Sequence, residues 1–114
     1  MPKNYKVYLQ DIKEATAKIE KYTKNLSFQE FKNNDLVIDA VVRNLEIIGE
    51  AAKKLPDQAK QKATDIEWKK IAGLRDILIH EYFGVDLEII WDIIKNKLPE
   101  LNKKVNQILK EQTR

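Results

Sequence analysis

The residues best suited to chemistry lie together in the segment 75–82, which reads Arg-Asp-Ile-Leu-Ile-His-Glu-Tyr and contains the only histidine of the chain. An arginine stays charged and can bind two phosphate oxygens at once. A neutral imidazole can take the proton of a ribose 2′-hydroxyl, and the oxygen then attacks the adjacent phosphorus to give a 2′,3′-cyclic phosphate and a free 5′-hydroxyl. We therefore interpret His80 as a candidate general base and Arg75 as a candidate stabiliser of phosphate charge in RNA cleavage.

A helix over this segment does not by itself bring the two groups together. On an ideal helix Arg75 and His80 lie about 140° apart, whereas Asp76 and His80 are four residues apart and share a face. Three arrangements remain open: the helix distorts near Ile79, the arginine reaches round, or two copies of the segment meet across a dimer. We favour the dimer, because it also brings two arginines to one phosphate. Asp76 can then accept a hydrogen bond from His80 and fix its tautomer.

The same residues also have a purely structural interpretation. Lone histidines are common, and the charges of residues 75–81 can belong to an ordinary helix surface, which the spacing alone favours. Tyr82 by itself fits a core or interface aromatic better than a reactive group. A second charged stripe favours an intrahelical ladder of ion pairs, with support of the active site as the alternative; its members are Asp39, Arg43, Glu46 and Glu50.

Composition excludes several kinds of site. The 114 residues include no cysteine and one histidine, which rules out disulfides and thiolate metal sites, so we expect no metal and no cofactor. The net charge is +3 with lysines spread along the chain, which fits a solvated surface better than a continuous nucleic-acid track. No apolar run reaches the ~20 residues of a membrane span. The N-terminus lacks the apolar region of a signal peptide, so we expect a cytoplasmic protein.

Apolar residues recur at helical spacing almost throughout, and no stretch alternates with period two. This pattern predicts an all-α fold: an antiparallel four-helix bundle with one or two short extra helices, in a single domain over residues 1–114. The second long helix has further apolar residues on another side (Ala40, Ile47 and Ala51), so it should lie centrally or pack against a second subunit. The three predicted seams are Tyr5, Tyr8, Ile12, Ala15, Ile19, Tyr22 and Leu26; then Ile38, Val41, Leu45, Ile48, Ala52 and Leu55; then Leu87, Ile90, Ile94, Leu98, Leu101, Val105 and Ile108.

Helix boundaries carry local signals. Ser27 with Glu30 predicts a capping box for a short helix over 28–32, and residues 33–35 predict a turn and an N-cap for the long helix that follows. Asp65 is the expected cap of a helix over 66–81, and Asp86 is the expected cap of the next one. Pro99 either kinks the last helix or lies in the first turn of a new one.

Three segments, in order, resemble a known family. Residues 75–82, read as Arg-x4-His-x-Tyr and followed by Gly84-Val85-Asp86, resemble the signature of HEPN-domain toxins of the HepT type. Residues 40–52 (AVVRNLEIIGEAA) resemble the second long helix of that family. Residues 86–91, running on to 98–101, are similar to the segment that follows the signature. The likeness covers nearly the whole chain.

The resemblance implies a helical-bundle ribonuclease that acts as a homodimer, with both motifs lining a cleft at the interface. It implies the toxin of a type VII-like toxin–antitoxin pair acting on tRNA or mRNA. Its partner is then an MntA-type nucleotidyltransferase antitoxin that transfers AMP onto Tyr82 and so places charge and bulk where RNA must dock. Many family members have Asn where this chain has Asp76, and a carboxylate there can pair with Arg75 or repel phosphate.

The resulting prediction is a metal-independent endoribonuclease. His80 acts as general base, Arg75 binds and stabilises the phosphate, Asp76 orients the site, and Tyr82 shapes the substrate site and accepts AMP. Two other functions remain open: a dimer that binds a nucleotide or RNA without cleaving it, and a structural partner subunit of a minimal nucleotidyltransferase.

Overall fold

The computed structural model describes residues 5–80 and 86–112, and within them every regular element is helical. The all-α prediction is therefore confirmed. The elements are α1 (Lys6–Thr23), α2 (Phe28–Lys32), α3 (Asp35–Lys54), α4 (Asp57–Lys60), the 3₁₀ turn η1 (Gln61–Ala63), α5 (Trp68–His80), α6 (Leu87–Asp92), the π-helical turn η3 (Ile93–Lys97) and α7 (Leu98–Gln112).

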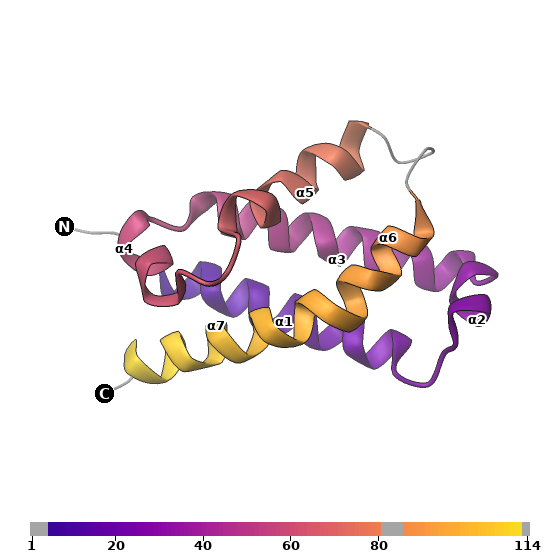
Figure 1. Cartoon of the computed structure of the whole chain (residues 1–114), viewed down its shortest axis with the longest axis horizontal. Coiled ribbons are helices and arrows are strands. Elements are labelled where there is room, and N and C mark those ends of the chain that lie inside the picture. Colours follow the sequence, from indigo (N-terminus) through magenta and orange to yellow (C-terminus); the bar gives the residue numbers. More distant parts are fainter. Residues whose placement is uncertain (1–4, 81–85, 113–114) are drawn as a thin grey trace.

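Helix α3 lies in the middle of the molecule, which is one of the two alternatives that its two apolar sides left open. It packs against α1 on one side and α5 on the other, and α1 in turn packs against α7 (Figure 1). Val41, Leu45 and Ile48 are fully buried between these neighbours, and Ala51 is 3% exposed. The site-bearing helix α5 is thus fixed mainly through its contact with α3.

The predicted seams form most of the core, but the α1 seam is partly wrong. Ile12 and Ile19 are fully buried as predicted, whereas Tyr8 is half-buried and Tyr22 is 38% exposed, and Leu9 and Thr23 are buried in their places. A buried threonine is tolerated at that position because its hydroxyl donates a hydrogen bond to the carbonyl of Ile19 (2.8 Å). The buried residues differ because the core face of α1 advances by four residues after Tyr5 and after Ile19, where the prediction advanced by three.

Three predicted caps are confirmed. The side chains of Ser27 and Glu30 form the complete capping box, the Asn34 side chain accepts from the N–H of Val37 (3.1 Å), and the Asp86 side chain accepts from the N–H of Glu88 (2.8 Å). Each of these bonds satisfies a backbone donor that a helix start leaves open.

The predicted start of α5 is wrong. The helix begins at Trp68 rather than near residue 66, and the Asp65 carboxylate pairs with Lys104 of α7 (3.3 Å) instead of capping. Trp68 explains the later start, because its indole is buried and its N–H donates to the carbonyls of Ala63 (3.0 Å) and Lys60 (3.2 Å). At the other end α5 reaches His80, and Glu81, to which we predicted it, lies outside the described residues.

Pro99 lies in the first turn of α7, which is one of the two alternatives the sequence left open. The helix before Pro99 does not end but widens into a π turn, in which the N–H of Leu98 donates to the carbonyl of Ile93, five residues back. A π turn of this kind accommodates a proline, which has no N–H to donate to the carbonyl four residues earlier. As a result α6, η3 and α7 follow one another without a break, and the rod of η3 and α7 lies along α1 while α6 rises away from it (Figure 1).

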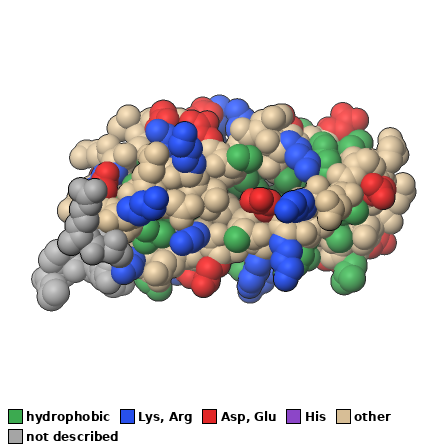
Figure 2. Space-filling model, turned by 90° about the horizontal axis from the view of Figure 1, so that it is seen from below, with side chains coloured by type: hydrophobic (Ala, Val, Ile, Leu, Met, Phe, Trp, Pro, Cys, Tyr) green, Lys and Arg blue, Asp and Glu red, His purple; other side chains and the backbone are tan. Residues whose placement is uncertain are grey.

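Charges of both signs are interspersed on the face shown in Figure 2. This agrees with the interpretation of the lysines as a solvated surface. Among the described residues, none of the helices combines the length and apolar character that crossing a bilayer would need.

Candidate functional site

The C-terminal half of α5 carries three of the four residues that the sequence assigned to the site, Arg75, Asp76 and His80. Arg75 and His80 lie on one helix that remains α-helical as far as His80. A regular helix keeps two residues five positions apart on different sides, about 140° from each other. The structure therefore gives no support for a distortion that would bring the two together before His80. Tyr82, the predicted AMP acceptor, lies outside the described residues.

Arg75 is held by a carboxylate from the central helix. Its Nε forms an ion pair with Oε2 of Glu50 on α3, and the two side chains are 37% and 42% exposed. Glu50 also lies 3.7 Å from the ammonium of Lys54, one turn further along α3. The carboxylate of Glu50 therefore lies between two cations contributed by two different helices.

Gly49 explains why α5 comes so close at this point. A Cβ placed on Gly49 would lie 2.8 Å from the backbone nitrogen of Arg75 and 3.2 Å from the carbonyl oxygen of Ile71. Real Cβ atoms do not approach backbone atoms so closely, so any larger residue would push α5 away. The glycine thus sets the distance between the helices at the residue next to Glu50.

A pocket of about 370 Å³ opens beside this ion pair, across α1, α3 and α5. It is lined by charges of both signs, and two further pairs hold its wall: Arg43 lies 3.9 Å from Glu46, and the Lys54 ammonium lies 6.0 Å from the ring centre of Tyr8. Each cation of the lining is paired with a carboxylate, and Arg75 is the one that comes from α5. The lining residues are Tyr8, Asp11, Arg43, Glu46, Ile47, Glu50, Ala51, Lys54 and Arg75.

The charged stripe of α3 forms ion pairs both within the helix and with α5. Arg43 and Glu46 pair within the helix, as the ladder interpretation predicts, and Glu50 pairs both with Lys54 one turn further on and with Arg75 on α5. The contact between Glu50 and Arg75 joins residues 25 positions apart, and the sequence did not predict it. One signal was present: a glycine inside a long helix costs about 1 kcal/mol relative to alanine, which hints at a close approach by a neighbour.

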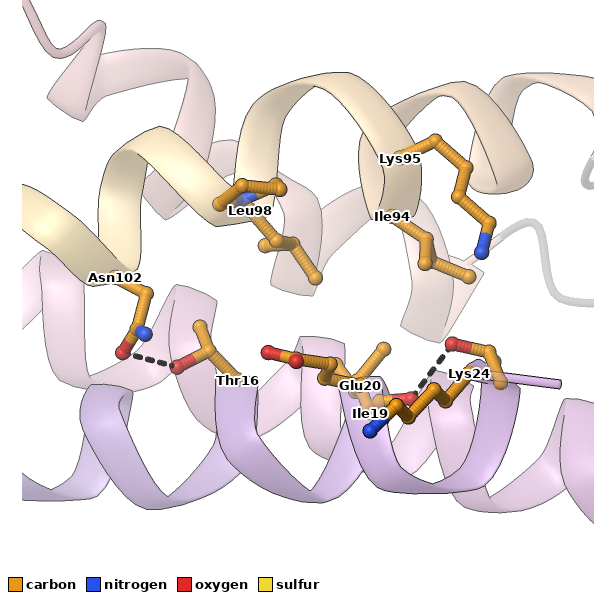
Figure 3. A pocket seen from close by; sticks show the side chains of 10 residues that line it. Thr16, Ile19, Glu20, Lys24, Ile94, Lys95, Leu98 and Asn102 are labelled. Atoms are coloured by element: carbon orange, nitrogen blue, oxygen red, sulfur yellow. Dashed lines mark hydrogen bonds between the residues drawn. The ribbon is translucent and has the colours of Figure 1, made fainter.

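A second pocket, of about 310 Å³, lies between α1 and the rod formed by η3 and α7 (Figure 3). At one end the Thr16 hydroxyl lies 3.1 Å from Oδ1 of Asn102, and at the other end the Thr23 hydroxyl bonds to Ile19 (Figure 3). Lys24 and Lys95 stand at its rim. Arg75, the assigned residue whose side chain the structure describes, does not line this pocket.

A third, mostly apolar pocket of about 450 Å³ separates α5 from the same rod. It is lined by Ile66, Ile71, Leu74, Ile93 and Leu101, with charged residues at its edge. It lies on the side of α5 that carries Ile71 and Leu74, and Arg75 does not belong to its lining. The pocket beside Glu50 is therefore the described pocket that contains a predicted site residue.

The described residues form only helices, the Arg-x4-His segment lies on one of them, and the arginine of that segment lines a pocket. These features match the class of helical ribonuclease that the sequence resembles. A family model described as "HepT-like: Ribonuclease HepT-like" matches residues 12–108. The chain belongs to this HepT-like family.

Curated relatives extend the likeness over almost the full length. The chain is 46% identical over 112 residues to "Putative RNase MJ1216" of Methanocaldococcus jannaschii, covering 97% of this chain and 93% of the relative. It is 45% identical over 105 residues to "Putative RNase TTE0752" of Caldanaerobacter subterraneus subsp. tengcongensis, covering 92% and 94%. It is 41% identical over 110 residues to "Probable ribonuclease HepT" of Thermococcus cleftensis, covering 96% and 100%. No solved structure matches the chain significantly.

Proposed function

We propose that this protein is a metal-independent endoribonuclease whose site combines Arg75 with His80. The observation that carries the proposal is the Arg75 guanidinium, which Glu50 holds at a pocket and which lies on the helix that reaches His80. Membership of the HepT-like family supports an RNA substrate. The relatives are named as RNases, and we propose the same activity for this chain.

The reaction begins at the ribose next to the bond that breaks. The neutral imidazole of His80 accepts the proton of the 2′-hydroxyl, and the 2′-oxygen attacks the adjacent phosphorus. The bond from phosphorus to the 5′-oxygen breaks, and that oxygen takes up a proton, which leaves a 2′,3′-cyclic phosphate and a 5′-hydroxyl. Arg75 binds the phosphate oxygens as their charge increases. Asp76 orients His80 through its second ring nitrogen.

A homodimer completes this site. On a helix that stays regular to His80, the arginine and the histidine of one subunit lie on different sides. In a two-fold dimer, the arginine of one copy can meet the histidine of the other, because each surface patch faces its counterpart. We propose that each chain contributes one HEPN-like four-helix domain to such a dimer.

In the cell, we propose, the protein is the toxin of a type VII-like toxin–antitoxin pair. The antitoxin is an MntA-type nucleotidyltransferase that transfers AMP to Tyr82 and thereby blocks the docking of tRNA or mRNA. The resemblance of residues 75–86 supports this part of the proposal, and so does the position of Tyr82, two residues after His80. An added phosphate beside Arg75 would compete with the substrate for the guanidinium.

The test uses the purified protein, His80→Ala and Arg75→Ala with end-labelled cellular RNA in the presence of EDTA. We expect the wild-type protein to produce ends with 2′,3′-cyclic phosphate, and each variant to lose about 100-fold or more in rate. Equal cleavage by the wild type and His80→Ala would overturn the proposal. Binding of RNA without any cyclic-phosphate product would favour a binding module instead.

A further inference from the structure

We propose that Glu50 is a positioning residue that holds the Arg75 guanidinium in the orientation in which it meets an RNA phosphate. The inference rests on the proposed function and deepens it, because it assigns a role to a residue outside the Arg-x4-His segment. Glu50 acts through Arg75 and does not itself contact the reacting atoms.

The first argument is the geometry of the contact. Glu50 contacts Arg75 through Nε, the nitrogen nearest the backbone, so the contact constrains the position of the guanidinium and the direction in which its Nε–H points. The residue before Glu50 is Gly49, where the backbone of Arg75 comes closest to α3. The Glu50 carboxylate and the Arg75 guanidinium therefore extend from α3 and α5, and the close backbone approach at Gly49 fixes the distance between these two helices.

The second argument concerns what such a pair contributes. The two side chains are about two-fifths exposed, and ion pairs open to solvent add little to folding stability. An arginine side chain, however, loses much rotamer entropy when it becomes ordered. Because Glu50 already holds Arg75 in place, that entropy is not lost when the substrate reacts. The contact with Glu50 therefore acts by orienting Arg75 and adds little to the stability of the fold.

The third argument is charge balance. A carboxylate close to a phosphate site normally repels the substrate, but Glu50 is also paired with Lys54 at 3.7 Å. The two cations offset its charge, so the pocket can keep an oriented arginine and still accept an anion. Glu46 provides a matched comparison, because it lines the same pocket from the same helix but pairs with Arg43.

The test compares Glu50→Ala with Glu46→Ala in the full-length protein. Both changes remove one carboxylate from the same helix face, and alanine favours a helix, so folding should persist. For Glu50→Ala we expect kcat to fall about 10-fold or more with KM unchanged or lower, because orientation is lost while repulsion is relieved. For Glu46→Ala we expect KM to fall with kcat within about twofold of the wild type. Glu50→Gln retains an acceptor oxygen and should recover part of the loss.

A second readout reports the contact without any cleavage. Arg43, Arg75 and Arg114 are the three arginines of the chain, so three Nε–H signals are expected in a nitrogen-15 NMR spectrum. The Arg75 signal should be shifted and protected from exchange in the wild type and in Glu46→Ala, and should move in Glu50→Ala, because the Glu50 carboxylate no longer accepts from Nε–H.

The outcomes separate the two claims. Unchanged or faster cleavage by Glu50→Ala, or an Arg75 signal that this variant leaves in place, would overturn the positioning role. Loss of cleavage that merely follows a loss of folded protein would overturn it as well. If the wild type fails to cleave RNA while the Arg75 signal moves as expected, the proposed function is wrong and the orienting contact stands.

Discussion

The backbone nitrogen of Arg75 lies so close to Gly49 that a Cβ on the glycine would be 2.8 Å from it. The contact is made by backbone, which cannot rotate out of the way as a flexible side chain can. Gly49→Ala should therefore force α5 away from α3 and destabilise the protein by about 1–3 kcal/mol, less the ~1 kcal/mol that alanine gains in a helix. Urea unfolding measures the difference.

Gly73 on α5 provides the control for that substitution. No atom of the described side chains and backbone lies within 4 Å of a Cβ added there. Gly73→Ala should therefore stabilise the protein by about 0.5–1 kcal/mol through helix propensity alone. Equal effects of the two substitutions would show that the close approach at Gly49 is not constraining.

Leu9 and Tyr22 on α1 should differ in how strongly their replacement by alanine destabilises the protein. Leu9 is fully buried and Tyr22 is 38% exposed, although the sequence pattern placed Tyr22 in the seam. Leu9→Ala should cost about 2–5 kcal/mol because it leaves a cavity, and Tyr22→Ala should cost less than about 1 kcal/mol. Thermal or urea unfolding of both variants checks the order, and a larger loss for Tyr22→Ala would contradict the described register of α1.

The pair of Asp65 and Lys104 predicts a dependence on pH. The hydrogen bond from Lys104 lowers the pKa of the Asp65 carboxyl below its ordinary value of 3.8. A carboxyl whose pKa is lower in the folded state stabilises the protein above its unfolded pKa, and the effect is lost as the pH falls through the folded value. Wild type should therefore exceed Asp65→Asn in stability at about pH 6, and the gap should shrink at about pH 3. A gap that stays constant between these conditions contradicts the expectation.

Regulation through Tyr82 is tested by mass. Intact-mass spectrometry of the protein expressed alone and with a cognate nucleotidyltransferase should show a gain of whole AMP units only in the second case. Tyr82→Phe should abolish the gain because it removes the acceptor hydroxyl. A gain that persists in Tyr82→Phe would place the modification on another residue.

Local features of this fold could be predicted from the sequence, and long-range ones could not. The capping box of Ser27 and Glu30 depends on residues three apart, and the structure confirms it. The Asp65 cap failed because Lys104, 39 positions away, takes its carboxylate. The pairing of Glu50 with Arg75 depends in the same way on how α3 and α5 cross, which helical spacing does not specify. A phosphate-binding role could be proposed for Arg75 from its type and neighbours, but its pairing with Glu50 could not be predicted.

The central claim, that two subunits pool the Arg75 and His80 side chains, is tested most directly by mixing Arg75→Ala with His80→Ala and allowing the subunits to exchange. Each protein alone should be inactive toward RNA. If the site is shared across a two-fold interface, a mixed dimer contains one site with both residues intact, and an equal mixture should recover about one quarter of the wild-type activity. A mixture that exchanges subunits and stays inactive would contradict the account.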